Sequence, residues 1–440
     1  MSRDHTVLRT RSIVVALSLA LASSALAACG DHEQDPYEST GGAGSGTGGS
    51  GGVGGAGPAP TYYEDIAPIL NESCATCHVE GGIAPFALLT YEDAKTASGI
   101  MKIKTGAREM PPWNIDNTGD CNTYADARLL TDAQIATIAA WADAGAPEGD
   151  PKNAPAPPTA PKGLDKIDKT IDTGFDYTPD ASLADEYRCF VVDLGLAEDR
   201  FVTGYEVRPG DKRVVHHAIL FAMESAAADA QVEALDAADP KPGYLCYGGP
   251  GAAQAQWTLG YAPGAGALMY PAGTGLPLRA GRKAVLQIHY NLANGPYPDR
   301  TKVDLTLEKK VDKQAQIVKV GTNDINLPPG MADVAATGQM KIPDGTGQFH
   351  VWGVGPHMHQ RGRTLRVDYE QGGQKTCIVD VQNWNFHWQG LALYSQPLAG
   401  SGGGTLSIRC GYDTTQETMP VTAGEGTSDE MCLNFLYVTQ

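Results

Sequence analysis

The sequence lacks any cluster of lysine and arginine, and it lacks a hydrophobic run long enough to span a membrane comfortably. Its 440 residues include 33 Lys and Arg against 51 Asp and Glu, which gives a formal net charge of −18. Phosphate binding needs a basic patch, so this composition argues against a nucleic-acid partner. The length is sufficient for two or three domains, each with its own core.

The first 28 residues have the pattern of an export signal. Arg3, Arg9 and Arg11 precede the apolar run "IVVALSLALASSALAA", which is short and rich in Ala and Ser. The run ends in "LAAC", which resembles the lipobox of bacterial lipoproteins, in which the cysteine becomes the lipidated first residue. We therefore predict a signal peptide (1–28), a lipid anchor at Cys29, and a location in the bacterial cell envelope, facing the periplasm or the exterior. An ordinary cleaved signal peptide is the alternative.

Two low-complexity stretches divide the remaining chain. Residues 29–60 contain "GGAGSGTGGSGGVGGAG", a flexible tether that cannot pack a core. Residues 150–182 begin with the proline-rich "DPKNAPAPPTAPKG", which favours extended structure and is typical of a linker. The chain is thus predicted to contain a small domain (61–149) and a large region (183–440).

The small domain carries a haem-attachment motif. Residues 74–78 read "CATCH", in which Cys74 and Cys77 can form thioethers with haem vinyl groups while His78 ligates the iron. The export signal agrees with this, because haem c is assembled outside the bacterial cytoplasm. A C-x-x-C disulfide or half a zinc site would not require His78.

The surroundings of this motif predict helices. "TYYEDIAPILNES" has apolar residues at helical spacing, and "TDAQIATIAAWADAGAP" opens with a capping box at Thr131 and Gln134 and places Ile135, Ile138, Ala139 and Ala142 on one face. In "REMPPW", Met110 is held extended before two prolines and is the expected sixth ligand of one covalent haem c. Met101, on the predicted helix "AKTASGIMKI", is the competitor. The region resembles class I c-type cytochromes.

The large region is predicted to form two antiparallel β-sandwiches. Short alternating runs such as "FVTGYEVRPG", "KAVLQIHYN" and "TLRVDYE" are bounded by turn residues. Roughly 255 residues are enough for two domains of ordinary size. The boundary is expected near "EKKVDKQAQ", which gives sandwiches at 183–312 and 313–440.

Seven of the ten histidines fall in this region. His357 and His359 in "PHMHQRG" are two residues apart, so on a strand they share a face and can hold one ion, while Met358 points away. A surface pair without metal is the alternative. His216 and His217 in "RVVHHAILF" are adjacent, so on a regular strand they should leave opposite faces. His350 and His387 are predicted to be structural.

Four separated motifs carry a family resemblance: "VVHHAILF", "LQIHYN", "PHMHQRG" and "GTSDEMC". Their order and spacing resemble those of copper type II, ascorbate-dependent monooxygenases, the family of peptidylglycine α-hydroxylating and dopamine β-type enzymes. The resemblance implies two jelly-roll-like copper domains and two copper ions. It assigns His216, His217 and His289 to an electron-transfer copper, and His357, His359 and Met431 to the catalytic copper where oxygen binds.

The ligand types suit this chemistry, because imidazole serves both oxidation states of copper whereas a thioether favours Cu(I). The reaction implied is hydroxylation of an aliphatic C–H by O2, with the second oxygen atom leaving as water. Gln287 also matches the family and is expected either to help order the first site or to face solvent. The resemblance further implies a disulfide between Cys410 and Cys432, which would brace Met431.

The chain departs from its peptide-processing relatives at the residues that hold a substrate carboxylate. An arginine and a tyrosine of those enzymes are replaced here by Gly355 and Phe435, which argues against peptidylglycine as substrate, although Arg361 or Arg363 could substitute. Six cysteines remain after Cys29, Cys74 and Cys77, and the resemblance pairs Cys410 with Cys432. The sequence does not assign the pairing of the remaining four, which are Cys121, Cys189, Cys246 and Cys377.

The whole sequence therefore predicts a multidomain protein: a small all-α cytochrome c-like domain followed by two antiparallel β-sandwich copper domains. The expected function is an exported copper monooxygenase that acts on a small organic substrate with O2. Its electrons are expected to come from an ascorbate-like reductant or a redox protein through the fused haem. The alternatives are an envelope haem and copper protein for electron transfer or copper handling, and a β-sandwich adhesin or carbohydrate binder with incidental histidines.

Overall fold

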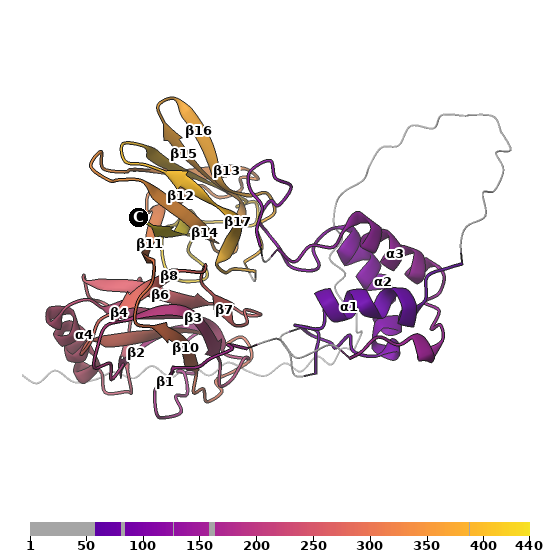
Figure 1. The fold of residues 1–440 in the computed structure, drawn as a ribbon, viewed down its shortest axis with the longest axis horizontal. Helices are drawn as coiled ribbons and strands as arrows, with labels where there is room; N and C mark the ends of the chain where they lie inside the picture. Colours follow the sequence, from indigo (N-terminus) through magenta and orange to yellow (C-terminus); the bar gives the residue numbers. More distant parts are fainter. Residues whose placement is uncertain (1–57, 81–83, 126, 158–162, 387) are drawn as a thin grey trace, which may run out of the picture. The chain divides into compact units, whose positions relative to one another are not determined.

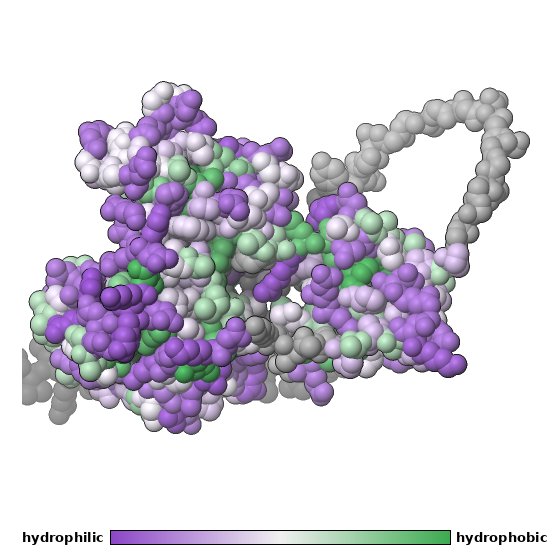
Figure 2. Space-filling model, in the orientation of Figure 1, coloured by the Kyte–Doolittle hydropathy of each residue, from purple (hydrophilic) through white to green (hydrophobic). Residues whose placement is uncertain are grey.

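The computed structural model describes residues 58–80, 84–125, 127–157, 163–386 and 388–440 (Figure 1). The predicted signal peptide, the anchor Cys29 and most of the tether lie outside these residues, as does His387. Within the described ranges, no helix combines the length and the hydropathy needed to cross a bilayer. The face drawn in Figure 2 is mainly hydrophilic, with small, separate apolar patches, which agrees with the excess of 51 acidic over 33 basic residues.

The small helical region forms around the "CATCH" motif. Its elements are η1 (Tyr62–Ile66), α1 (Ala67–Ser73), α2 (Tyr91–Gly106) and α3 (Asp132–Asp143). The capping box predicted at Thr131 and Gln134 is present, and Thr90 with Asp93 caps α2 in the same way. The predicted buried face of α3 is partly wrong: Ile138 and Trp141 are buried, whereas Ala139 and Ala142 are only partly so. The large Trp141 ring draws that side of the helix inward.

The N-terminal sandwich consists of two sheets that share one core. One sheet has the order β5-β2-β9-β4-β6, and the other contains β1-β10-β3-β8, with β7 beside β3. Buried aliphatic side chains from both sheets, such as Leu220 and Leu286 on one and Val202 and Leu305 on the other, pack into a single cluster. The bounds are β1 Lys169–Asp172, β2 Asp185–Asp193, β3 Arg200–Arg208, β4 Val215–Met223, β5 Tyr244–Leu245, β6 Ala255–Tyr261, β7 Leu268–Met269, β8 Thr274–Leu278, β9 Lys283–Asn291 and β10 Lys302–Glu308.

The C-terminal sandwich is built in the same way. Strands β11-β20-β14-β17 face the sheet β13-β18-β15-β16, and β12 pairs with β19. The core between the sheets includes Val351, Val367, Ile408 and Leu436. The bounds are β11 Lys313–Thr322, β12 Asn326–Leu327, β13 Val334–Lys341, β14 Phe349–His357, β15 Gly362–Gln371, β16 Gln374–Val381, β17 Ala392–Gly400, β18 Thr405–Tyr412, β19 Val421–Thr422 and β20 Cys432–Thr439.

The two sandwiches are joined by a strand pair that the sequence did not predict. β10 ends at Glu308 and β11 begins at Lys313, and the segment between them falls in "EKKVDKQAQ". However, β11 pairs in parallel with β8 and extends one sheet across both sandwiches. The hydroxyls of Thr274 and Tyr437 lie 2.8 Å apart at this junction. Among the named strands of the described residues, every pairing is antiparallel except the β8–β11 pair that links the two halves.

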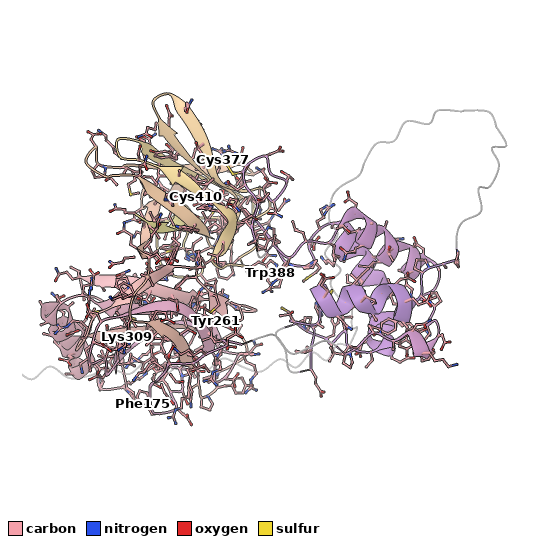
Figure 3. All side chains as sticks on the ribbon, in the orientation of Figure 1. Phe175, Tyr261, Lys309, Cys377, Trp388 and Cys410 are labelled. Carbon is pink, nitrogen blue, oxygen red and sulfur yellow. A yellow bond between two sulfur atoms is a disulfide. The ribbon has the colours of Figure 1, made fainter. Side chains whose placement is uncertain are left out.

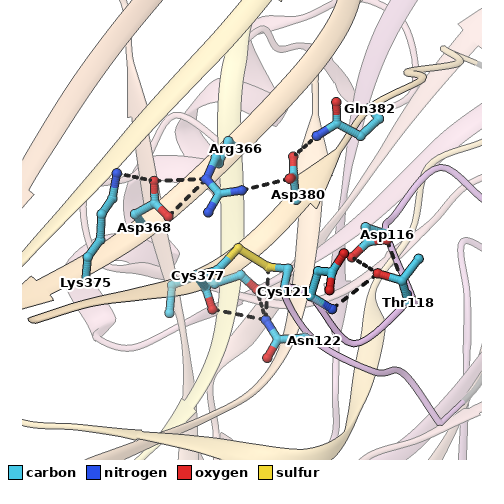
Figure 4. The surroundings of a disulfide bond; sticks show 12 residues. Asp116, Thr118, Cys121, Asn122, Arg366, Asp368, Lys375, Cys377, Asp380 and Gln382 are labelled. Carbon is cyan, nitrogen blue, oxygen red and sulfur yellow. Dashed lines mark hydrogen bonds and ion pairs between the residues drawn. A yellow bond between two sulfur atoms is a disulfide. The ribbon is translucent and has the colours of Figure 1, made fainter.

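Residues 113–125, which connect α2 to α3 and which we call the arm, pack on the C-terminal sandwich. Ile115 and Tyr124 are part of its core and form isolated β-bridges to Val381 and Tyr394. A disulfide joins Cys121 of the arm to Cys377 of β16 (Figure 4). A segment of the region 61–149, where the sequence predicts a haem domain, is thus built into the C-terminal sandwich.

Candidate copper centres

The adjacent histidines of β4 converge because the strand contains a bulge. The pairing of β4 with β9 shifts register between Val215 and His217, which leaves His216 as the extra residue. A bulge bends the strand and re-aims a side chain that would otherwise leave the opposite face. The rings of His216 and His217 lie 4.2 Å apart between centroids, and one ligand atom from each of them and from His289 can be chosen so that all three lie within 4.8 Å of one another.

The third ring, that of His289 on β9, is oriented by a hydrogen bond at one nitrogen and by stacking on an aromatic ring. Its Nε2 donates a hydrogen bond to Oδ1 of Asp185 at 2.9 Å, and its ring stacks on Tyr187 with 4.1 Å between centroids. Because Nε2 carries the proton, Nδ1 keeps its lone pair, and it lies 3.4 Å from Nδ1 of His216. Burial holds the pKa of His217 well below its usual value, so this ring is neutral. Neutral imidazoles that converge in this way fit a copper ion.

The second pair is placed by the end of β14. His357 is the last residue of the strand and His359 follows Met358, which was expected to point away from the pair and is fully buried in the sandwich core. The two rings lie 5.2 Å apart. Burial lowers the pKa of His357 to about 3 and also lowers the pKa of His359. Both rings are therefore neutral at ordinary pH and can act as ligands.

Hydrogen bonds fix which nitrogen of each ring would face a metal. Nδ1 of His357 donates to Oε1 of Gln389 at 2.5 Å, and the amide of Gln389 is oriented by its own donation to the carbonyl of Phe386 at 2.7 Å. Nδ1 of His359 donates to the carbonyl of Asp429 at 3.1 Å. Both rings therefore present Nε2 with its lone pair, whereas His289 presents Nδ1. Such outer hydrogen bonds typically orient metal-binding histidines.

Met431 directly precedes β20 and lines the same cavity as His357 and His359. The expected disulfide between Cys410 and Cys432 is formed, and the hydroxyl of Tyr412 donates to the carbonyl of Met431 at 2.8 Å. The backbone that carries this thioether is therefore anchored on both sides. Two histidines with one methionine form a softer donor set than three histidines, which suits Cu(I).

Glu430 is a site residue that the sequence reasoning missed. Its fully buried carboxyl accepts hydrogen bonds from the backbone N–H groups of His359, Arg361 and Met431 at 2.9, 2.7 and 3.3 Å. Burial raises its pKa to about 7. One side chain thus ties together the two segments that carry the second ligand set. An acidic residue next to a predicted ligand, in "DEMC", was the available signal.

A cavity of about 420 Å³ lies between the two ligand sets. His217 and His289 line one part, and His357, His359 and Met431 line another. The rings of His217 and His357 are 6.3 Å apart between centroids. The remaining wall is largely aromatic and aliphatic, and it includes Tyr205, Phe221, Trp257, Tyr261 and Leu433.

The substrate-side substitutions noted in the sequence face this cavity. Gly355 on β14 is the register partner of Phe435 on β20, whose ring packs on Trp257 at 4.0 Å. The suggestion that Arg361 or Arg363 replaces the missing arginine is wrong. Arg361 pairs with Glu417 at 2.7 Å and Arg363 with Asp413 at 3.5 Å, and neither is among the described residues that line the cavity. Lys319 is the basic residue of its wall.

Two further expectations can be placed. Gln287 is buried, lines the cavity and donates to Sγ of Cys246, so the solvent-facing alternative is wrong. Cys246 is bonded to Cys189, which completes the pairing that the sequence left open. His350 lies on β14 beside Trp352, away from both ligand sets.

The predicted haem residues follow the end of α1. Cys74 and Cys77 form no disulfide, and burial raises the pKa of Cys74 to about 12. His78 donates from Nδ1 to the carbonyl of Phe86 at 2.9 Å, which leaves Nε2 with its lone pair. Met101 is buried in the core of the helical region, whereas Met110 lies half-buried in the segment after α2.

Comparison with known proteins agrees with the family predicted from the motifs. Residues 313–439 match the model of the copper type II ascorbate-dependent monooxygenase C-terminal domain. Tyramine beta-hydroxylase of Caenorhabditis briggsae is 25% identical over 250 residues, which are 52% of this chain and 40% of that protein. Dopamine beta-hydroxylase of Rattus norvegicus is 26% identical over 273 residues, 57% of this chain and 43% of that protein.

The chain spans about two fifths of the length of these relatives. The family model covers the segment that carries His357, His359 and Met431, and the similarity agrees with the family predicted from the motifs. Residues 313–439 therefore match the C-terminal domain of the copper type II ascorbate-dependent monooxygenase family, and about half of the chain is similar in sequence to tyramine and dopamine beta-hydroxylases.

Proposed function

We propose that this protein is an exported copper monooxygenase that hydroxylates an aliphatic C–H bond of a small organic molecule. The observation that carries the proposal is the convergence of two chemically different ligand sets on one cavity. Three histidines fit a copper that passes single electrons, and two histidines with Met431 fit a copper that is stable when reduced. When bound, the two ions would supply the redox chemistry that the side chains themselves lack.

The overall reaction balances with two electrons and two protons. The substrate R–H and O2 give R–OH and water, so an external reductant is required. The chain's own contribution is to hold the imidazoles neutral, to fix their tautomers through Asp185, Gln389 and the Asp429 carbonyl, and to surround the substrate with a mostly apolar wall. Ascorbate, which the family uses, or a redox protein would serve as the donor.

The cavity supports a substrate that is aromatic or apolar. Its wall is formed mainly by aromatic and aliphatic side chains, and the carboxylate-binding arginine and tyrosine of peptide-processing relatives are Gly355 and Phe435 here. The relatives are named for tyramine and dopamine, which are small aromatic amines. We therefore expect small aromatic amines or uncharged aromatic compounds to be turned over in preference to peptides that end in glycine.

Metal analysis and electron paramagnetic resonance (EPR) of the purified protein test the copper assignment. Wild type should bind two Cu(II) ions with distinct spectra, His216→Ala should lose one, and Met431→Ala should alter the other. Substrate-dependent O2 uptake then separates a monooxygenase from an envelope protein that only transfers electrons or handles copper. Bound copper without O2 uptake on any aromatic substrate would favour the latter.

We also propose that Cys74, Cys77 and His78 hold a covalent haem c that delivers electrons to the histidine-only copper. The ring of His78 fits this role, because its hydrogen bond to Phe86 leaves Nε2 for iron. Loss of covalent haem in Cys74→Ala, together with a changed haem spectrum in Met110→Leu but not in Met101→Leu, would support both the haem and its sixth ligand. A reduced haem that is not reoxidised anaerobically by Cu(II)-loaded protein would exclude the electron-transfer role.

The location is proposed on the sequence alone. The signal-like residues 1–28 and the "LAAC" preceding a cysteine support a lipoprotein anchored through Cys29 in the bacterial envelope. Incorporation of labelled fatty acid that is lost in Cys29→Ala would support the anchor. Release of an unlabelled mature chain would instead indicate an ordinary cleaved signal.

A further inference from the structure

The arm that leaves α2 reaches the shell of the second ligand set. Asn114 stands four residues after Met110, and its Nδ2 donates to two backbone carbonyls, those of Asn385 at 3.1 Å and Trp388 at 2.7 Å. Both acceptors belong to the connection between β16 and β17 (382–391), and Figure 3 labels Trp388 there. A single amide therefore joins the arm to two points of this connection.

The same connection contacts the predicted copper ligands. Gln389, next to Trp388, accepts the hydrogen bond from Nδ1 of His357. The ring of Phe386, next to Asn385, lies 5.0 Å from His216 and 6.0 Å from His359 between centroids. Each carbonyl that Asn114 binds is thus one residue away from a side chain in contact with a histidine of the site.

The arm is held firmly enough to set the position of this connection. Ile115, directly after Asn114, is buried in the sandwich core, and its neighbour Asp116 donates its N–H to the carbonyl of Asp380 at 2.8 Å. The disulfide between Cys121 and Cys377 fixes the far end of the arm on β16. Asn114 therefore projects from a segment that is fixed independently of the connection that it binds.

We propose that Asn114 is a positioning residue for the second copper site. It holds the backbone of the β16–β17 connection so that Gln389 fixes the tautomer and the angle of His357. Through this contact the arm binds the same β16–β17 connection that positions His357. A change in the segment that carries Met110 therefore alters the orientation of His357. The inference rests on the proposed function in one respect only, namely that His357 and His359 bind copper.

The test uses the full chain with a His216→Ala background, in which copper bound at His357 and His359 dominates the EPR spectrum. Asn114→Ala should change the Cu(II) hyperfine splitting and weaken copper binding about tenfold, the lower range observed when an outer partner of a metal ligand is removed. Gln389→Ala should produce a similar change. Because both act through one contact, the double variant should be no worse than the single variants, a non-additive result.

Asn122→Ala is the matched control. Asn122 lies in the same arm and likewise donates from Nδ2 to two backbone carbonyls, those of Cys377 at 3.1 Å and Ile378 at 2.9 Å (Figure 4). These acceptors lie on β16 and not in the connection, so this variant should lose comparable stability and keep the wild-type spectrum. If Asn114→Ala does not fold, Asn114→Asp, which is isosteric and lacks the donating hydrogens, gives the same test.

Three results would overturn the proposal: an unchanged spectrum and affinity in the Asn114 variants, equal changes in Asn122→Ala, or additive effects of Asn114→Ala and Gln389→Ala. These outcomes are separate from a failure of the proposed function. Normal copper binding without O2 uptake would refute the monooxygenase and leave the positioning role intact. Absence of copper binding in the His216→Ala background would refute the ligand assignment and the positioning role together.

Discussion

Asp185 offers a direct test of how the first ligand set is organised. Its carboxylate accepts hydrogen bonds from Nε2 of His289 at 2.9 Å and from the amide of Asn291 at 3.0 Å. Burial alone would raise the pKa of Asp185, but the hydrogen bonds from His289 and from the amide of Asn291 outweigh it, and the pKa lies below its usual value. The group is therefore ionised at neutral pH and keeps the proton of His289 on Nε2.

The expected magnitude follows from this contact. A hydrogen bond to a charged group contributes about 1.5 to 3 kcal/mol, which corresponds to a factor of roughly 10 to 150 in an equilibrium constant. Asp185→Ala should therefore weaken copper binding at His216, His217 and His289 by one to two orders of magnitude. Asp185→Asn retains an acceptor and loses the charge, so it should lie between Asp185→Ala and wild type.

Chelator competition in a His357→Ala background measures this affinity, because copper is then held mainly by the three-histidine set. Asp180→Ala is a suitable control: Asp180 is near in sequence, but it pairs with Lys241 at 2.8 Å and not with a histidine. An Asp185→Ala protein that binds copper within twofold of wild type would refute the tautomer argument. An equal loss in the control would indicate a general effect on the fold.

Three further predictions concern stability. In wild type the Glu430 carboxylate accepts hydrogen bonds from the backbone N–H groups of His359 and Arg361. Glu430→Gln replaces one of the two acceptor oxygens by an NH2 group, so the free energy of unfolding of the metal-free protein in urea should fall by about 2 kcal/mol. Asp239→Asn removes the bidentate partner of Arg188, which is 1% exposed, and should cost about 3 kcal/mol. The hydrogen bond from Arg188 lowers the pKa of Asp239 to about 2. The ionised pair therefore stabilises the fold fully above the pKa of the unfolded chain, near 3.8, and this stabilisation is lost as the pH falls toward 2. Thermal unfolding of Asp239→Asn should not show that acid-dependent loss. Replacing Cys121 and Cys377 by Ser should make the arm cleavable in limited proteolysis while the sandwich cores remain resistant.

The sequence predicted those features of the site that depend on local spacing. The rings of His357 and His359 lie 5.2 Å apart, as the two-residue spacing predicts, although the strand itself ends at His357. The cap of α3 was visible in Thr131 and Gln134. The helix α4 (Ala226–Ala238) was missed between strands, although Ser225 caps it and its alanines favour a helix. These elements are determined by residues within one turn or one strand.

Features set by pairing between distant segments were beyond the sequence. The bulge at His216 exists only relative to the register of β9, so the adjacent histidines gave no sign of which way they would turn. The buried residues Ile115 and Tyr124 of the arm follow neither a helical nor a strand-like hydrophobic period. The position of the arm on the C-terminal sandwich depends on partners more than 250 residues away in the sequence. Family resemblance supplied the ligand assignment, but it could not supply the arm.

The shared sheet explains why two ligand sets from different sandwiches can meet in one cavity. Met431 directly precedes β20, which carries Phe435 in its middle. β20 pairs with β14, which ends at His357, and with β11, which pairs with β8 of the other sandwich. Trp257 of β6 packs on Phe435 and closes the same wall from the N-terminal side. The first ligand set lies on β4 and β9 of the facing sheet, which packs on the N-terminal part of the shared sheet through one core. Because hydrogen-bonded strands connect that part to β20 and β14, a change that weakens the β8–β11 pair should alter the spacing of the two ligand sets.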